Sequence, residues 1–379
     1  MAHPYRYPPD AYATHGSTDE DLPSPGILVV DLDALARNYR KMREAAAPAD
    51  CAAVVKANAY GLGIVPIARR LAREGCRRFF VATAGEGPEL REVLPGASIY
   101  VLDGVLPGSE RVLLGAGLTP VLNSVDQIDR WVRAGGGSAV LHVDTGMSRL
   151  GLDEAAVAEI ARRPARLQSV DVECVMTHLA CADEPGHQMN REQLERFAAL
   201  RAKLPPAPTS IGNSAGIFLG LEHRGDIVRA GIGLYGGNPF TDRDSPVEPV
   251  VNLSAMIVQL RTVAEPSTVG YGATHDARPP CRLAVCGVGY ADGYPRSVGN
   301  RCTASFRGLR VPVVGRVSMD LTCLDVSAVP EDEIGPGAFV ELIGGAVGLD
   351  EVAAAAGTIG YEILTGLGSR LERRYEGLA

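Results

Sequence analysis

Lys56 ends a short apolar run, and this position indicates chemistry at an amine. The run covers residues 51–56, and the hydroxyl-bearing Tyr60 follows four residues later, directly before Gly61 and shortly before Gly63. A lysine at the end of an apolar strand is partly desolvated, which makes its amine more nucleophilic toward a carbonyl group. This is the chemistry of a Schiff base with an aldehyde cofactor. For a lone lysine, a stem that packs while the head reaches solvent would be the preferred interpretation, so the decision depends on what else the chain supplies.

Two further clusters follow apolar runs. Residues 142–151 contain Asp144 and Arg149 in a glycine-containing loop, where the arginine could form a surface ion pair or donate to a cofactor oxygen. His178 follows another run, and a lone histidine is more often structural than catalytic. At the end of a barrel strand the two interpretations become about equally weighted.

Small residues gather in two later segments, 212–216 and 228–237. In barrels of alternating strands and helices, glycine-rich segments after the last strands commonly expose backbone N–H groups to a phosphate. Ser214, Gly231 and Ile232 suit that task. Either glycine run alone is weak evidence, because such turns also occur for purely geometric reasons.

The elements that must position these residues alternate along the first two thirds of the chain. The expected strands are 52–55, 79–82, 98–102, 119–122, 139–143, 172–176, 210–211 and 226–235. Helical periodicity recurs between them, in segments such as 64–73, 126–133, 154–162 and 191–203. About eight strands, each followed by a helix, predict a (β/α)8 TIM-like barrel in an α/β chain, with its site in the loops after the strands.

A mostly antiparallel β domain is expected after the barrel. Residues 238–249 are rich in proline, charge and turn formers and read as a linker. The following β-like runs are 251–263, 282–288, 309–314, 320–326 and 338–343, and a helical tail is expected over 349–375. The predicted division is an N-terminal extension over 1–25 that is only loosely ordered, a barrel domain over 26–240 and a C-terminal β domain over 246–379.

Composition excludes several classes of protein. The chain has 379 residues, a net charge of -8 and no basic patch interleaved with aromatics, which argues against nucleic acid. Its start has no continuous apolar stretch of the secretory kind, and no run approaches the roughly 18 residues of a membrane span. The eight cysteines have no zinc-like spacing and suggest buried thiols in a reducing, cytoplasmic compartment. We therefore expect no metal and no membrane partner.

Together with further blocks at 269–274, 289–295, 315–320 and 358–363, these clusters resemble the alanine racemase family of fold-type III pyridoxal phosphate enzymes. The resemblance covers about 27–375. It implies a homodimer that interconverts L- and D-alanine through an external aldimine of pyridoxal 5'-phosphate. D-alanine is a peptidoglycan precursor, and the sequence does not decide between a biosynthetic and a catabolic role.

The resemblance also implies a role for individual residues. Lys56 and Tyr271, the latter from the partner subunit, would be the two catalytic bases on opposite faces of the substrate. Arg229 would face the pyridine nitrogen, Arg149 the phenolic oxygen, and His178 would link Arg229 to Tyr271. The implied phosphate ligands are Tyr60, Asn213, Ser214, Gly231, Ile232 and Tyr361. Met319 would bind the substrate carboxylate through its N–H, with Asp320 nearby and Arg149 also contributing.

These residue types fit a racemisation. An amino group attached to the cofactor makes the Cα proton removable, and two acid/base groups on opposite faces then suffice. Arginine cannot accept a proton, so Arg229 would leave the ring nitrogen neutral and disfavour transamination. Because Lys56 and Tyr271 would come from different chains, the hypothesis requires an oligomer.

Two positions depart from the family pattern. His142 stands where many members carry a lysine, often carbamylated, whose charge positions the arginine that corresponds to Arg149. We therefore expect Arg149 to be held by a bound anion, such as chloride, or by another protein group. Gly360 stands where asparagine is frequent, and it would either loosen the substrate entrance or adapt the local backbone.

Three alternatives remain open. A racemase of broader specificity is the closest, and a barrel-type amino acid decarboxylase would share Lys56 but need a group for a distal amine. A non-enzymatic pyridoxal phosphate carrier would have no β domain.

Overall fold

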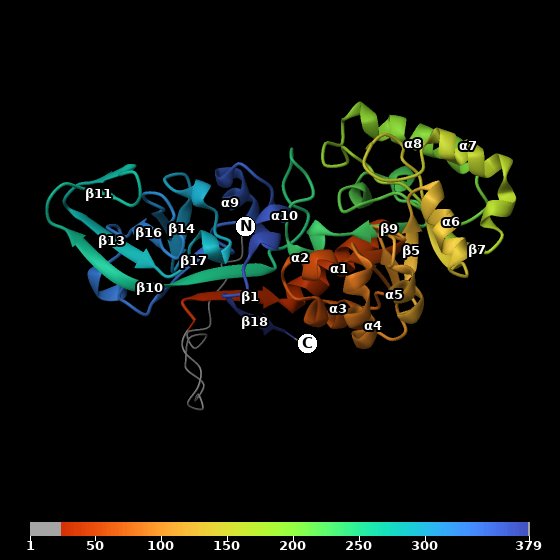
Figure 1. Cartoon of the computed structure of the whole chain (residues 1–379). Coiled ribbons are helices and arrows are strands. Elements are labelled where there is room, and N and C mark those ends of the chain that lie inside the picture. Colours follow the sequence, from red (N-terminus) through yellow and green to blue (C-terminus); the bar gives the residue numbers. More distant parts are fainter. Residues whose placement is uncertain (1–23, 378–379) are drawn as a thin grey trace. The chain divides into compact units, whose positions relative to one another are not determined.

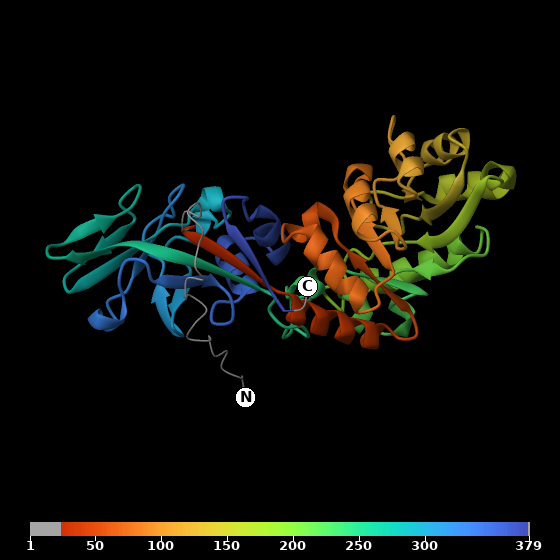
Figure 2. The ribbon, with the colours of Figure 1, turned by 90° about the horizontal axis from the view of Figure 1, so that it is seen from below.

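The computed structural model describes residues 24–377, and these divide into two compact units. The expected N-terminal extension therefore lies outside the described residues, except for its last two. One unit comprises Asp31–Val250 with the chain end from Tyr375, and the other comprises Val251–Arg374 with the residues before Asp31. Figures 1 and 2 show the chain in two views.

The first unit is a closed eight-stranded parallel barrel, which confirms the predicted fold. Its strands are β2 (Asp50–Val54), β3 (Arg78–Val81), β4 (Ser98–Val101), β5 (Thr119–Leu122), β6 (Gly137–His142), β7 (Val170–Met176), β8 (Thr209–Ser210) and β9 (Ile227–Ala230). The barrel closes where Asp50 of β2 pairs with Ile227 of β9. All residues of β5 and β9 are buried, as expected for parallel strands covered on both faces.

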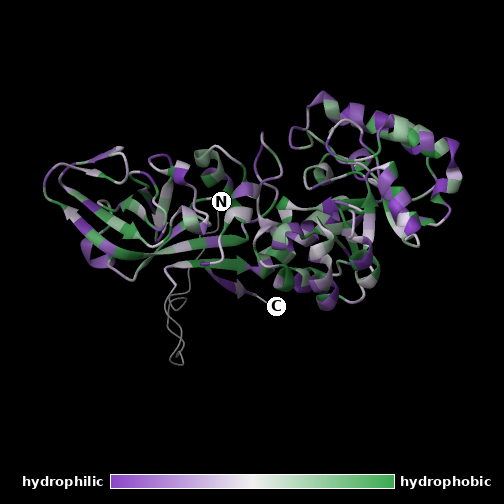
Figure 3. Ribbon diagram, in the orientation of Figure 1, coloured by the Kyte–Doolittle hydropathy of each residue, from purple (hydrophilic) through white to green (hydrophobic). Residues whose placement is uncertain are grey.

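Helices surround this barrel. They are α1 (Leu32–Ala46), α2 (Lys56–Tyr60), α3 (Ile64–Arg73), α4 (Gly87–Val93), α5 (Glu110–Gly115), α6 (Val125–Arg133), α7 (Glu154–Arg162) and α8 (Gln188–Arg201). Side-chain caps start several of them, since Asp31, Ser124 and Asp153 accept from backbone N–H groups of α1, α6 and α7. Polar residues recur along α7 and α8 in Figure 3.

The last two barrel strands do not follow the expected repeat. The chain after β8 forms only the 3-10 turns η3 (Gly216–Phe218) and η4 (Leu221–His223) before β9. The strand expected over 226–235 ends at Ala230 and continues as the 3-10 turn η5 (Ile232–Tyr235). Glycines at 231, 233 and 236 explain the early end, because they carry no Cβ to pack on a strand face.

The second unit is built on antiparallel strands, also as expected. The main sheet has the order β15-β14-β17-β10-β1-β18, and β13 pairs with both β10 and β16. The bounds are β1 (Gly26–Asp31), β10 (Val251–Val263), β13 (Cys281–Cys286), β14 (Thr303–Phe306), β15 (Leu309–Pro312), β16 (Thr322–Asp325), β17 (Phe339–Ile343) and β18 (Glu372–Glu376). A separate hairpin consists of β11 (Ser267–Val269) and β12 (His275–Ala277).

Two expectations for this unit need correction. Strand β1 falls in the range assigned to the barrel domain, yet it forms a ladder with β10, in which Gly26 pairs with Ala255. The expected helical tail contains only α9 (Leu349–Ala356) and α10 (Gly360–Gly366), and it ends in strand β18. Gly357, in the left-handed conformation with φ 76°, ends α9.

Candidate active site

Lys56 lies on a backbone turn of unusual hand. Strand β2 ends at Val54, and the next residues form one turn of left-handed helix, with φ of 53° at Ala57, Asn58 and Ala59. The turn is closed by hydrogen bonds of normal length, such as that from the N–H of Gly61 to the carbonyl of Ala57 at 2.8 Å. A helix of either hand has 3.6 residues per turn, so Lys56 and Tyr60 project from the same side.

The surroundings of Lys56 favour a neutral amine. Burial lowers the pKa of this lysine, and the positive charge of Arg149 lowers it further. The carboxylates of Glu86 and Asp103 oppose this shift without reversing it. A larger fraction of the amine is thus unprotonated at a given pH, which is the state that attacks a carbonyl carbon.

Arg229 lies on strand β9 and is buried. Its guanidinium donates to the hydroxyl of Ser210 at 2.5 Å and to the backbone carbonyls of Thr177 and Ile211 at 2.7 and 3.2 Å. Burial lowers the pKa of Arg229 to about 10, so the group still carries its proton near neutrality. An arginine in this state offers donors only.

The contact with Arg229 defines the tautomer of His178. Arg229 Nη2 lies 3.1 Å from His178 Nδ1, and since arginine only donates, Nδ1 accepts and Nε2 carries the hydrogen. Burial, followed by the charge of Arg229, holds the pKa of His178 well below its usual range. His178 is therefore a neutral imidazole that can donate from Nε2.

Gln193 of α8 fixes the segment that carries His178. Its amide nitrogen donates to the carbonyl of His178 at 2.9 Å and to the hydroxyl of Thr145 at 3.0 Å, while its oxygen accepts from Ala180 N–H at 2.8 Å. Gln193 is fully buried, so these three bonds replace water entirely.

His142 has a direct protein partner, Asn123. Asn123 donates its amide hydrogens to the carbonyls of Leu102 and Val121, both at 2.9 Å, so its oxygen faces His142 Nδ1 at 2.7 Å as an acceptor. His142 therefore carries its hydrogen on Nδ1. Burial and the nearby arginines lower the pKa of His142 to about 4, so the ring is neutral.

The loop after β6 presents Arg149. Asp144 does not pair with this arginine, because its Oδ1 accepts from the N–H groups of Gly146 and Met147 at 2.9 Å and of Ser148 at 3.2 Å. Across residues 24–377 Arg149 forms no hydrogen bond or ion pair, and its side chain is exposed. The expectation of an anion beside Arg149 stays a prediction.

The two glycine-rich segments meet around Ser214. Its hydroxyl oxygen accepts from the N–H of Gly231 at 2.8 Å and of Gly233 at 3.4 Å. A Cβ at Gly231 would lie 2.7 Å from the hydroxyl of Tyr60, so only glycine leaves this space open. The ring of Tyr60 lies 4.6 Å from that of Tyr235. We name Tyr60, Ser214, Gly231 and Ile232 the phosphate cradle after the role expected for them, and phosphate binding there stays a prediction.

Asn213 has a local structural contact. Its side-chain oxygen accepts from the N–H of Gly216 at 2.9 Å and so shapes the loop that presents Ser214. Its expected role as a cofactor ligand stays a prediction.

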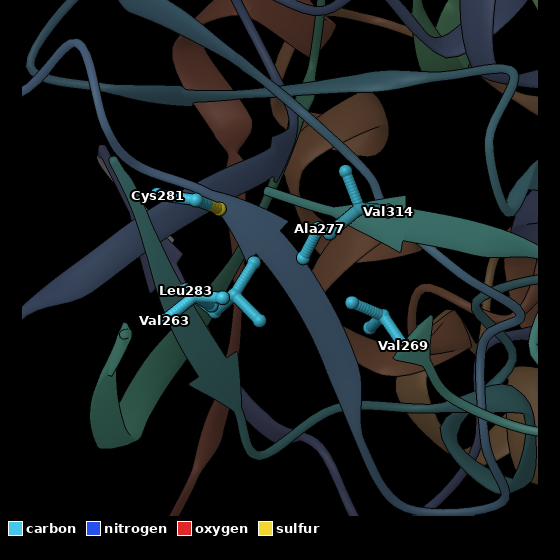
Figure 4. Packing of buried hydrophobic residues seen from close by; sticks show 6 residues of the cluster. All are labelled: Val263, Val269, Ala277, Cys281, Leu283 and Val314. Atoms are coloured by element: carbon cyan, nitrogen blue, oxygen red, sulfur yellow. The ribbon is translucent and has the colours of Figure 1, made fainter. Parts of the chain in front are cut away.

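Tyr271 belongs to the second unit, in the turn between β11 and β12. Its side chain is 68% exposed. The hairpin is anchored through Val269 and Ala277, which belong to a buried cluster with Val263, Cys281, Leu283 and Val314 (Figure 4). A fixed hairpin thus presents an accessible phenol.

Met319 and Asp320 lie on a loop held from two sides. A Cβ at Gly289 would lie 2.4 Å from the carbonyl oxygen of Met319, so the backbones approach closely there. Arg370 donates to Asp320 at 2.8 Å and to the buried Asp292 at 2.7 Å. The Met319 side chain remains 54% exposed.

Tyr361 and Gly360 begin helix α10. The Tyr361 side chain is 41% exposed. A Cβ at Gly360 would lie 2.9 Å from Asp350 Oδ1, which supports a packing reason for this glycine rather than a wider entrance.

The structure thus brings together the expected barrel residues and adds four residues that contact them or their loops. Lys56 interacts electrostatically with Arg149, Arg229 contacts His178, and the cradle residues converge. Tyr271, Met319, Asp320 and Tyr361 lie in the other unit. The residues that sequence reasoning missed are Glu86, Asn123, Gln193 and Ser210. Asn123 directly follows the expected strand 119–122. A polar side chain just after an apolar strand is the signal that indicated His178, and the same signal could have indicated Asn123.

Comparison with known proteins agrees with this geometry. Residues 30–239 match the alanine racemase N-terminal domain, and residues 250–375 match its C-terminal domain. An alanine racemase of Rhodospirillum rubrum is 49% identical over 93% of this chain and 96% of its own length. A catabolic alanine racemase of Mesorhizobium japonicum is 45% identical over 93% of each chain.

Solved structures give the same result. The alanine racemase of Bartonella henselae, solved with covalently bound pyridoxal phosphate, is 38% identical, with a TM-score of 0.89 over 93% of this chain and 100% of its own. The biosynthetic alanine racemase of Pseudomonas aeruginosa is 36% identical, with a TM-score of 0.87 over the same shares. This chain belongs to the alanine racemase family.

Proposed function

We propose that this protein is an alanine racemase that interconverts L- and D-alanine with pyridoxal phosphate. The main support is Lys56, an amine with a lowered pKa that lies one helical turn from Tyr60 of the phosphate cradle. The amine binds the cofactor aldehyde, and the cradle binds the phosphate.

The residues present fit this cofactor. The space over Gly231 would be filled by a single Cβ, and it is lined by the hydroxyls of Tyr60 and Ser214. The N–H groups of Gly231 and Gly233 both donate to the hydroxyl oxygen of Ser214, so this hydroxyl is held beside the space. Arg149 and Arg229 bring positive charge to the surroundings of His142 and His178, which suits the phenolic oxygen expected beside Arg149.

Lys56 and Tyr271 perform the proton transfers. Pyridoxal phosphate supplies an electron sink that makes the Cα proton of an attached amino acid removable. One of the two residues takes that proton on its nitrogen or oxygen, and the other delivers a proton to the opposite face. After one turnover, the residue that took the proton is protonated and the residue that delivered one is deprotonated. A turnover in the reverse direction restores both states.

Arg229 and His178 control the charge around the reacting centre. Arg229 can only donate hydrogen bonds and keeps its own proton at neutral pH. A ring nitrogen that faces it would therefore stay unprotonated, and the ring would stay a weak electron sink. His178 accepts from Arg229 and offers its Nε2 hydrogen to the phenol of Tyr271. Met319 N–H and Arg149 bind the substrate carboxylate, with Asp320 held near Met319 by Arg370. Asn213 and Tyr361 complete the binding of the phosphate.

The active species is a homodimer in which the barrel of one subunit receives Tyr271 of its partner. A mixing experiment tests this arrangement. Lys56→Ala and Tyr271→Phe are each expected to be inactive, because each removes one of the two bases. After dissociation and random re-association, about half of the dimers are mixed, and each mixed dimer has one intact site. The mixture should therefore recover about one quarter of wild-type activity. A mixture that stays inactive would show that both residues act within one chain.

Substrate class is tested with a panel of L-amino acids assayed for loss of optical rotation with added pyridoxal phosphate. Alanine should dominate the panel. Equal rates with bulky amino acids would indicate a broader racemase, and release of carbon dioxide would indicate a decarboxylase.

The site is expected to work in the cytoplasm. None of the eight cysteines forms a disulfide, as is usual for proteins of a reducing compartment. No helix within residues 24–377 has the length and apolar character needed to cross a membrane. The reaction runs both ways, so it could supply D-alanine for peptidoglycan or consume it.

A further inference from the structure

The left-handed turn that carries Lys56 needs support from outside itself. Ala57, Asn58, Ala59 and Tyr60 all have positive φ, between 53° and 57°. None is glycine. The left-handed conformation is unfavourable for each of these residues, because its Cβ approaches the following carbonyl oxygen. Four such residues in succession persist only where surrounding contacts select this conformation over an ordinary turn.

Glu86 provides a contact at the start of this turn. Its Oε1 accepts from the N–H of Ala57 at 2.7 Å. The first N–H groups of a helical turn have no carbonyl partner within the turn, and a side-chain oxygen can satisfy them in place of water. A charged acceptor forms a stronger bond than a neutral one. The carboxylate thus acts on the residue directly after Lys56.

The other oxygen of Glu86 anchors it to the barrel. Oε2 accepts from the N–H of Ala82 at 2.7 Å and of Thr83 at 3.3 Å, just after strand β3. Helix α4 follows directly, and its first residue, Gly87, packs so closely on Leu118 that a Cβ would lie 2.3 Å away. Glu86 is therefore a bridge between a fixed strand end and the turn.

We propose that Glu86 is a positioning residue, whose carboxylate clamps the left-handed turn and thereby holds Lys56 and Tyr60 in the arrangement that binds the cofactor. The role in cofactor binding rests on the proposed function, whereas the clamp is a property of the protein alone. The simpler alternative is that Glu86 only caps the loop at residues 82–83.

Hydrogen exchange of the cofactor-free protein separates these two roles. Glu86→Gln retains the size of the side chain, but its NH2 group cannot accept a hydrogen bond. Only one contact can then remain, either the one to Ala57 N–H or the one to the N–H groups of Ala82 and Thr83. Glu86→Ala removes both. Glu89→Gln is the matched control, since it makes the same change at an exposed position of α4. Loss of the charged bond should speed exchange in the peptide over 57–63 by roughly 10- to 100-fold in Glu86→Ala.

The pH dependence of cofactor capture gives a second measurement. The charged groups that act on Lys56 are Arg149, Glu86 and Asp103. Glu86 raises the pKa of Lys56, so Glu86→Gln should lower that pKa and move the midpoint of pyridoxal phosphate capture to lower pH. The dissociation constant should rise roughly 10-fold or more in both Glu86 variants. The shifted midpoint follows from the charge of Glu86 beside Lys56, so the exchange over 57–63 is the measurement that separates the clamp from a cap at residues 82–83.

The outcomes are distinct. Faster exchange over 57–63 with a shifted midpoint, both absent in Glu89→Gln, supports the clamp. Faster exchange confined to residues 82–86 overturns it, and so does an equal effect in the control. If wild-type protein captures no cofactor, the proposed function fails, while the exchange result still decides the clamp.

Discussion

His142 should make the barrel sensitive to mild acid. The perturbation is protonation of this buried imidazole, whose pKa in the folded protein is about 4, against an ordinary value of 6.5. Between these two values the unfolded chain binds a proton that the folded chain does not. The stabilising contribution of neutral His142 is therefore fully present above about pH 6.5 and is lost as the pH falls toward 4.

The size of this effect follows from the shift. Each pKa unit corresponds to about 1.4 kcal/mol, so the full contribution is about 3 kcal/mol, and about 2 kcal/mol of it is lost by about pH 5. His142→Gln removes the titration, and its amide can still donate to Asn123. The variant should therefore lose about 2 kcal/mol less stability than wild type between about pH 7 and pH 5.

The measurement is urea unfolding followed by the fluorescence of Trp131. This residue is the only tryptophan and lies buried in α6 of the barrel unit, so its signal reports that unit. His187→Gln removes an exposed imidazole and defines the background, since the glutamine oxygen can replace Nδ1 as the acceptor for the N–H of Met189 at the start of α8. The reasoning is refuted if wild type and His142→Gln lose equal stability on acidification, or if labelled-histidine NMR finds the His142 hydrogen on Nε2.

Two further substitutions test the cradle and the support of His178. Gly231→Ala should weaken pyridoxal phosphate binding by roughly 10-fold or more, because the new Cβ lies 2.7 Å from the hydroxyl of Tyr60. Gly115→Ala, with no atom within 4 Å of its Cβ, is the control, and equal affinity of the two variants would contradict the cradle. Gln193→Leu leaves the carbonyl of His178 and the N–H of Ala180 unpaired, whereas Thr145 keeps its hydrogen bond to Thr177, and the substitution should cost about 2–5 kcal/mol in the same unfolding assay. Gln188→Leu, at an exposed position of α8, should change stability far less.

Elements with complete local signals could be predicted from sequence. The helix expected over 154–162 has the bounds of α7, because Asp153 caps it and its apolar residues repeat at helical spacing. The run 251–263 has the bounds of β10, because its length and apolar content leave few alternatives. Strand β18 was missed, since Glu372–Glu376 is mostly charged and forms a strand only through its pairing beside β1.

The site shows the same division. Strand ends identified Lys56, His178 and the glycine-rich segments, because a parallel barrel gathers the loops after its strands at one end. The left-handed turn had no local signal, since its residue types disfavour that conformation and only distant contacts such as Glu86 select it. The role of Tyr271 came from resemblance alone, because no pattern within a chain indicates which of its residues serve a partner.

The interleaved connectivity of the two units limits how this protein can be cut. The backbone passes from one unit to the other at residues 30/31, 250/251 and 374/375. A gene fragment that stops at Val250 would leave β1 without its partner strand β10. It would also lose Tyr375, whose hydroxyl donates to the carbonyl of Leu62 at 2.9 Å. A single proteolytic nick therefore yields no autonomous half, and recombination that separates the barrel cleanly requires at least two breakpoints.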